Sequence, residues 1–160
     1  SPSPAGLAAF LAAVVFLAAV VFFAAAVRVV ARGDALLALL TDVLLPSADR
    51  ALVVTTPDTV CARDAQIVAR LLDDRRIPSH LLINRLRPAK VMDGSMPDVD
   101  EIIDTAGIRL LGIVPEDEAV AVANANGRPL PADCHAALCF ANIARRFLGE
   151  SVPLARLEKM

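Results

Sequence analysis

The sequence lacks tryptophan and tyrosine altogether, and it contains only six phenylalanines. Proteins that hold single-stranded nucleic acid stack bases on such rings and attract the phosphate backbone with basic surfaces. The formal net charge of this chain is −2, so a basic field is missing as well. These two absences exclude nucleic acid as an expected partner.

A phosphate-binding loop is also absent from the sequence, because no segment of the form G-x-x-x-x-G-K-[ST] occurs in the 160 residues. In P-loop ATPases this loop cradles the phosphates of the nucleotide. Phosphoryl transfer depends almost entirely on positioning and on stabilising the phosphate charge. We therefore expect no catalytic residue here, and no hydrolysis of ATP by the chain alone.

Cysteine and histidine are scarce, with three and two copies. An odd number of cysteines without paired spacing favours a reducing compartment. Cys134, His135 and Cys139 are close in sequence, but positions five apart share a helix face poorly, so we predict buried apolar cysteine and no metal site. His80 has no nucleophile in view with which it would make a hydrolytic triad.

What the sequence has in excess is a run of 23 uncharged residues, positions 5–27. A helix of that length can cross about 30 Å of hydrocarbon, and Arg28 and Arg32 after it would favour the cytoplasmic side. The run is apolar all round, so periodicity leaves three interpretations open: a membrane-spanning helix, a buried helix, or a sequence artefact. The chain begins with Ser1, from which we expect a fragment or a processed product.

After residue 33 the pattern alternates between helix and strand. We therefore divide the chain into an apolar helical segment, residues 1–32, and an α/β part, residues 33–160. A parallel sheet with right-handed crossovers is the predicted fold class. Helices are predicted over 34–45, 57–74, 98–106 and 133–148, strands over 50–56, 81–83 and 109–114, and loops over 87–96 and 116–131.

Several finer predictions concern the helices. Asp98 and Glu101 have the spacing of a capping box, and Gly107 is a natural helix end. Asp133 is expected to cap the last helix, which Gly149 closes. The buried face of the helix at 57–74 is expected to carry the apolar stripe Ile67, Val68, Leu71 and Leu72.

A polar cluster follows each predicted strand: Thr55 to Asp58, then Asn84-Arg85, then Pro115-Glu116-Asp117. Ligands of open parallel sheets bind outside the carboxyl ends of the strands, so these clusters predict a site at one edge. Asn suits the reading of a base, because its amide both donates and accepts hydrogen bonds. The alternative is that turns simply favour Asn, Asp and Pro.

Five motifs in this region occur in a recognisable order. They are ALVVTTPD, ARDAQIV, LLINRLRP, DEIIDTAGIRLLGIVPEDEAV and NIARRFLGESVPL. Over roughly residues 46–155 the chain resembles the C-terminal half of the MinD family, septum-site ATPases of the deviant P-loop MinD/ParA group. The resemblance implies a partial P-loop-NTPase-like α/β fold.

The resemblance also implies roles for particular residues. It implies ATP as cofactor, with Mg in the complete family domain. It implies Min-system protein partners, a homodimer and a membrane surface. The residues that would frame the adenine are Asn84, Arg85, Pro115, Glu116 and Asp117, and those that would face partners are Arg63 and Asp64.

The chain also departs from the family pattern. The family's KGGxGKT loop is missing, and about 40 mostly apolar residues separate a segment similar to SPAG, residues 3–6, from the first strand. The implied function is ATP-dependent regulation of septum placement at the cytoplasmic face of the inner membrane. The alternative is a non-catalytic, membrane-anchored interaction module on a degenerate ATPase fold.

Overall fold

The computed structural model describes residues 48–154. The predicted helices at residues 5–27 and 34–45, and the boundary at residue 33, lie outside the described residues. Within the described range, no helix reaches the length and hydrophobicity that crossing a bilayer requires. In chain order the elements are β1 (Ala51–Thr55), α3 (Thr59–Asp74), β2 (Ser79–Leu86), α4 (Pro88–Met92), α5 (Val99–Ala106), β3 (Leu110–Pro115), α6 (Glu118–Ala125) and α7 (His135–Phe147).

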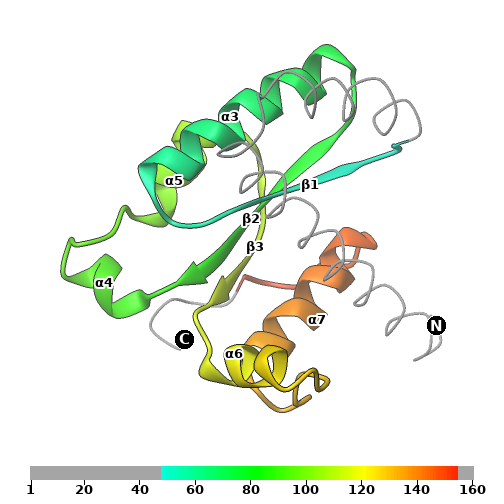
Figure 1. Cartoon of the computed structure of the whole chain (residues 1–160). Helices are drawn as coiled ribbons and strands as arrows, with labels where there is room; N and C mark the ends of the chain where they lie inside the picture. Colours follow the sequence, from blue (N-terminus) through cyan, green and yellow to red (C-terminus); the bar gives the residue numbers. More distant parts are fainter. Residues whose placement is uncertain (1–47, 155–160) are drawn as a thin grey trace.

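Three parallel strands form a sheet in the order β1-β2-β3. Helices α3 and α5 lie on one face of this sheet and α7 lies on the other (Figure 1). On β2, Leu81 and Ile83 are buried in the cluster that includes α3 and α5, whereas Leu82 is buried with Ala136 and Ile143 of α7. A parallel sheet covered on both faces is typical of α/β proteins, and the predicted fold class is confirmed for this part of the chain.

Helix α3 has the predicted end, and Leu72 of its predicted apolar stripe is buried and Leu71 half-buried. The prediction is wrong for Ile67 and Val68. Ile67 and Val68 are 49% and 38% exposed, while Ala62, Ala65 and Leu72 are buried. Small alanines let the helix backbone approach the sheet closely, so they take the inner face. Ile67 and Val68 are left on the outer face.

Two predicted loops contain short helices. Helix α4 begins at Pro88, whose fixed φ suits the first turn of a helix. Helix α6 begins after Asp117, whose side chain accepts from the backbone N–H of Ala119. The prediction of a loop over residues 116–131 is therefore wrong for α6. This helix has a weak amphipathic pattern, and the Asp117 cap supports its start.

The capping predictions are confirmed in one case and wrong in another. The Asp98–Glu101 capping box forms at α5, and Gly107 ends that helix at a φ of 67°. At α7 the cap is Cys134, whose sulfur accepts from Ala137 N–H, instead of Asp133. Cys139 is buried against the sheet, as predicted for a core cysteine.

Candidate functional site

Strand β2 carries the polar pair predicted at its end, but the strand runs past the pair to Leu86. Arg85 has a left-handed φ of 60°, and the pairing with β3 shifts register between Asn84 and Leu86. The backbone N–H of Arg85 donates to Oδ1 of Asn84 at 3.0 Å. The predicted turn is therefore a bulge within the strand, which redirects these two side chains.

Glu116, just after β3, joins the ends of β2 and β3. Its Oε1 accepts from Nη2 of Arg85 at 3.0 Å, and its Oε2 accepts from Nε of Arg87. Its backbone N–H donates to the Leu86 carbonyl at 2.8 Å. The hydrogen bonds from Arg87 and Arg85 lower the pKa of Glu116 to about 2, so the carboxylate is charged at neutral pH.

Asp117 holds the first turns of two helices. Its Oδ1 accepts from Ala119 N–H at 2.9 Å and its Oδ2 from Ala136 N–H at 3.0 Å. The N–H of Ala136 first, and then that of Ala119, keeps the pKa of Asp117 below its usual range. One carboxylate thus fixes α6 and α7 relative to the end of β3.

The predicted cluster that follows β1, Thr55 to Asp58, caps the start of α3. Thr56 Oγ1 donates to Asp58 Oδ2 at 2.6 Å, and Asp58 Oδ1 accepts from Cys61 N–H at 2.8 Å. Burial raises the pKa of Asp58, but hydrogen bonds from Thr56 and Cys61 outweigh it and lower the pKa overall. Within residues 48–154, the side-chain hydrogen bonds of this cluster stay among residues 55–61 and do not reach the ends of β2 and β3.

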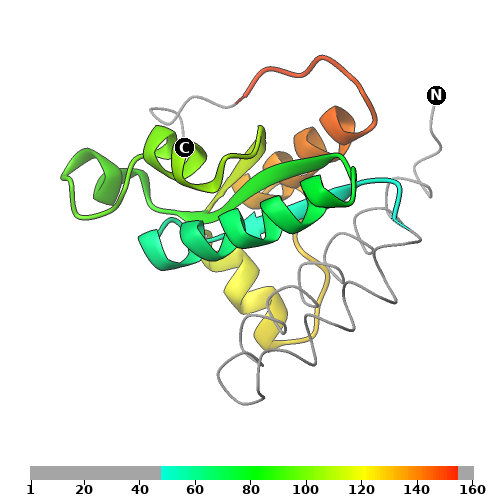
Figure 2. The same ribbon diagram turned by 90° about the horizontal axis from the view of Figure 1, so that it is seen from above.

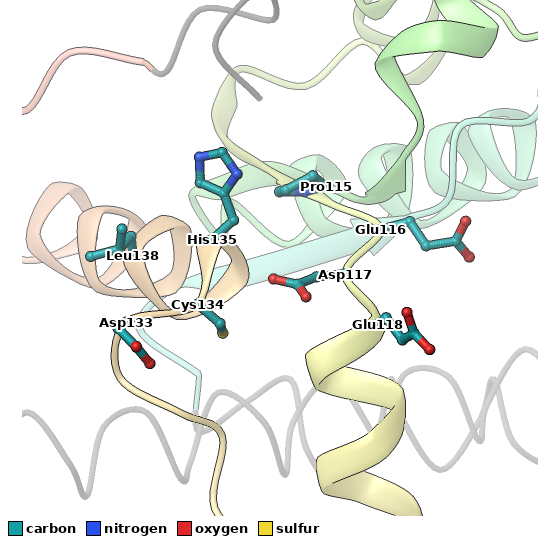
Figure 3. Close-up of a pocket in the computed structure, with 8 residues that line it drawn as sticks. All are labelled: Pro115, Glu116, Asp117, Glu118, Asp133, Cys134, His135 and Leu138. Atoms are coloured by element: carbon teal, nitrogen blue, oxygen red, sulfur yellow. The ribbon is translucent and has the colours of Figure 1, made fainter.

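An open hollow of about 660 Å³ lies beside the end of β3, between the starts of α6 and α7 (Figure 3). Figure 3 shows Asp117 pointing toward the start of α7, while the Glu116 carboxylate points the opposite way. The lining residues are Pro115, Glu116, Asp117, Glu118, Asp133, Cys134, His135 and Leu138.

The structure therefore brings most, but not all, of the predicted site residues together. Pro115, Glu116 and Asp117 line the hollow, whereas Arg85 is linked to it only by its ion pair with Glu116. Asn84 does not line the hollow and accepts from the backbone N–H of Arg85. The sequence did not predict that the start of α7 lines the hollow, although helices that follow parallel strands begin near the edge of the sheet where the strands end. In the described part of the chain, no group of three or more His, Cys, Asp or Glu residues is arranged to hold a metal ion.

Arg63 and Asp64 lie elsewhere, on α3. Arg63 is exposed and Asp64 is half-buried. The same helix also exposes Val60, Ile67 and Val68, at 69%, 49% and 38%. Charged and apolar side chains therefore share the outer face of α3.

Comparison with known proteins found no family model that matches the chain. The septum site-determining protein MinD of Bacillus subtilis is 43% identical over 116 residues, which cover 70% of this chain and 43% of that protein. In the Aquifex aeolicus MinC:MinD complex, the matching structure has 34% identity and a TM-score of 0.65, covering 69% of this chain and 47% of that one. MinD of Pyrococcus horikoshii, solved with Mg-ADP, has 18% identity and a TM-score of 0.55, covering 65% of this chain and 45% of that one, and shares the fold. The chain spans less than half the length of each.

Proposed function

Because about 70% of the chain is homologous to the C-terminal half of MinD, we propose that it is the adenine-binding and partner-facing half of a MinD-type ATPase. That protein would regulate placement of the division septum through ATP-dependent dimerisation and attachment to the cytoplasmic face of the inner membrane. The observation that carries the proposal is the convergence of Asn84-Arg85 with Pro115, Glu116 and Asp117 at one edge of the sheet.

The residues at this edge fit the base of a nucleotide. Asn84 Nδ2 has no hydrogen-bond partner among the described residues, so it can donate to a ring nitrogen. Its Oδ1 keeps a second lone pair, which can accept from an exocyclic amine. Pro115 is buried and rigid, and both Asp117 oxygens already accept from backbone N–H groups, so these residues shape the site without reading the base.

The phosphate end has no such fit in the described residues. The sequence contains no phosphate loop, and the described residues hold no metal cluster. Transfer of the ATP phosphoryl group, with the help of Mg, would take place only in a complete family domain. We therefore assign this chain the recognition of adenine and no catalytic step.

The experiment is a titration of the 160-residue chain with adenosine, using guanosine as the specificity control and amide NMR shifts as the readout. Adenosine is expected to give saturable shifts around Asn84 and Glu116. Asn84→Ala should weaken its binding roughly tenfold to a hundredfold, since losing one or two hydrogen bonds costs about 1–3 kcal/mol. Asn124→Ala, at an exposed position of α6, is the matched control. Unchanged affinity in a folded Asn84→Ala protein would remove Asn84 from the site.

A second function is favoured by the exposed face of α3. This face is a mixed apolar and charged surface of the kind used in protein interfaces. Its apolar residues are Val60, Ile67 and Val68, and its charged residues are Arg63 and Asp64. We propose that this face meets a Min-system partner. The chain would then also serve as a non-catalytic interaction module, anchored to the membrane by residues 1–32.

Partner binding in the absence of nucleotide separates the two functions. An interaction module would bind a MinC-type protein equally well with and without ATP, whereas an ATP switch would bind it only with nucleotide. Arg63→Glu should weaken binding in either case, and Arg128→Glu, an exposed loop position away from α3, should not.

A further inference from the structure

The end of the sheet opposite the hollow carries a group of three basic side chains. Arg50 and Arg109 directly precede β1 and β3, and His80 is near the start of β2. Each of them lies two positions before a leucine that packs in the cluster between the sheet and α7; these are Leu52, Leu82 and Leu111. Because successive side chains of a strand alternate between its two faces, all three basic side chains lie on the α7 face of the sheet.

The strand register places the three residues next to one another. Leu52 of β1 is opposite His80, and the backbone N–H of Leu81 donates to the carbonyl of Arg109 at 2.8 Å. His80 therefore lies between the two arginines. Burial first, and then the charges of Arg109 and Arg50, lower the pKa of His80, so its ring is neutral at neutral pH.

No carboxylate compensates the two arginines in the described part of the chain. Arg50 donates from Nη1 to the carbonyl of Phe147 at 3.2 Å, and its guanidinium lies 5.9 Å from the centre of the Phe147 ring. These contacts hold Arg50 at the end of α7 and leave its Nε and Nη2 as donors. Arg109 is exposed and forms no ion pair with the described residues. Two neighbouring positive charges without a counterion attract an anion.

His80 adds a neutral donor between the two charges. Its Nδ1 is buried and has no hydrogen-bond partner among the described residues. Buried N–H groups are left without a partner more rarely than buried acceptors are, so we place the ring hydrogen on Nε2. The Nε2–H group can then donate to a bound anion while the ring stays neutral.

We propose that Arg50, His80 and Arg109 bind a phosphate group at the amino ends of the strands. Guanidinium groups match the oxygens of phosphate in geometry as well as in charge. Donors from three strands suit a tetrahedral anion better than a planar carboxylate, which a single guanidinium can satisfy. A soluble phosphate ester and the headgroup of phosphatidic acid offer this same chemistry. The site lies at the opposite end of the sheet from the proposed adenine site and does not depend on it.

Imidazole NMR of the full chain in a mild non-ionic detergent tests the site. Inorganic phosphate is the probe, and sodium chloride of equal ionic strength is the reference. The chain has two histidines, so His135 at the start of α7 is an internal control. Phosphate is expected to shift the His80 signals saturably and to leave those of His135 unchanged.

Two variants test whether the arginines carry the binding. Arg109→Gln should weaken phosphate binding about tenfold, because it removes a charged donor. Arg128→Gln removes the same charge from an exposed position in the loop after α6 and should leave the affinity unchanged. Equal affinities in the native chain and in folded Arg109→Gln would overturn the site. A His80 shift that does not saturate, or that His135 shares, would also overturn it.

A soluble short-chain lipid, dihexanoyl phosphatidic acid, separates the two sources of the phosphate group. Binding tighter than that of glycerol phosphate supports a lipid headgroup at this site, whereas equal or weaker binding supports a soluble phosphate ester. Adenosine binding is a separate measurement at the other end of the sheet. Its failure would contradict the proposed function and leave the phosphate result unaffected.

Discussion

At the scale of single residues, Asp117 caps two helices at once. A side chain at a helix start normally satisfies one of the free backbone N–H groups there. Asp117 satisfies N–H groups at the starts of two helices, with Ala119 of α6 and Ala136 of α7. The wall of the hollow between α6 and α7 therefore depends on one carboxylate, which lies beside the proposed base site.

Asp117→Ala is expected to destabilise the fold by about 0.5–2 kcal/mol for each helix cap lost. Urea unfolding monitored by circular dichroism measures the change. Asp133→Ala is the control, because Asp133 is exposed near the same helix start while Cys134 supplies the cap. Similar losses in the two variants would show that the double cap contributes no particular stability.

The same comparison has a defined dependence on pH. The pKa of Asp117 is lowered in the folded protein, so its contribution is present above the ordinary carboxyl pKa of about 4. That contribution disappears as the pH falls through the folded pKa, because protonation removes the charged acceptor. The stability difference between the native chain and Asp117→Ala should therefore be full at pH 7 and shrink below pH 4.

At the scale of elements, strong local signals were sufficient to predict α3, α5 and the three strands. Pro57-Asp58 and the Asp98–Glu101 box begin their helices with side-chain chemistry that acts within a few residues. Helix α6 was missed although its cap, Asp117 with the N–H of Ala119, is local, because the helix has a weak amphipathic pattern. The exposed Ile67 and Val68 were misassigned because helical spacing does not say which of two apolar faces meets the sheet.

The placement of the candidate site residues could likewise be predicted only as far as local patterns and the parallel topology allow. Convergence of the strand ends follows from parallel topology, and the structure places the residues from β2 and β3 side by side. The involvement of Arg87 and of the start of α7 depends on side-chain contacts between segments about 20 to 30 positions apart in sequence. No periodicity or local motif reports contacts of that kind.

The attachment of the C-terminal segment to the sheet is also a matter of elements. Arg146 of α7 donates to three carbonyls: Leu111 at 2.8 Å, Val152 at 2.7 Å and Pro153 at 2.6 Å. Gly112 makes room for α7 as a whole, because a Cβ there would lie 2.3 Å from Ile143 Cγ1 and 3.1 Å from Nη1 of Arg146. Figure 2 shows the segment after α7 turning back past the sheet.

Arg146→Gln is expected to release residues 150–154 from β3. Each hydrogen bond from a charged donor contributes about 1.5–3 kcal/mol, and glutamine cannot reach three separate carbonyls. Hydrogen exchange at residues 150–154 should accelerate, and limited proteolysis should cut there first. Arg145→Gln, which loses a contact with Glu150 only, should retain the protection. Equal exchange rates in the two variants would contradict this function of Arg146.

At the scale of the whole molecule, the described residues place helices on both faces of a three-stranded sheet. One buried cluster lies between the sheet and helices α3 and α5, and a second lies between the sheet and α7. Among the described residues, the first buried member of these clusters is Val53, and Ala51 and Leu52 pack against them. The excess of hydrophobic residues in the composition comes mainly from the sequence before residue 46.

Deleting residues 1–32 is therefore expected to give a protein that stays in the aqueous phase, while the full chain needs mild detergent. The reason is that 23 contiguous uncharged residues expose more apolar surface than water tolerates. Sedimentation of both proteins with and without detergent measures the difference. The opposite result, with stronger aggregation of the shortened protein, would mean that the apolar segment covers part of the α/β fold. Because β1 is an edge strand of the described sheet, its unpaired side is where such cover would be lost.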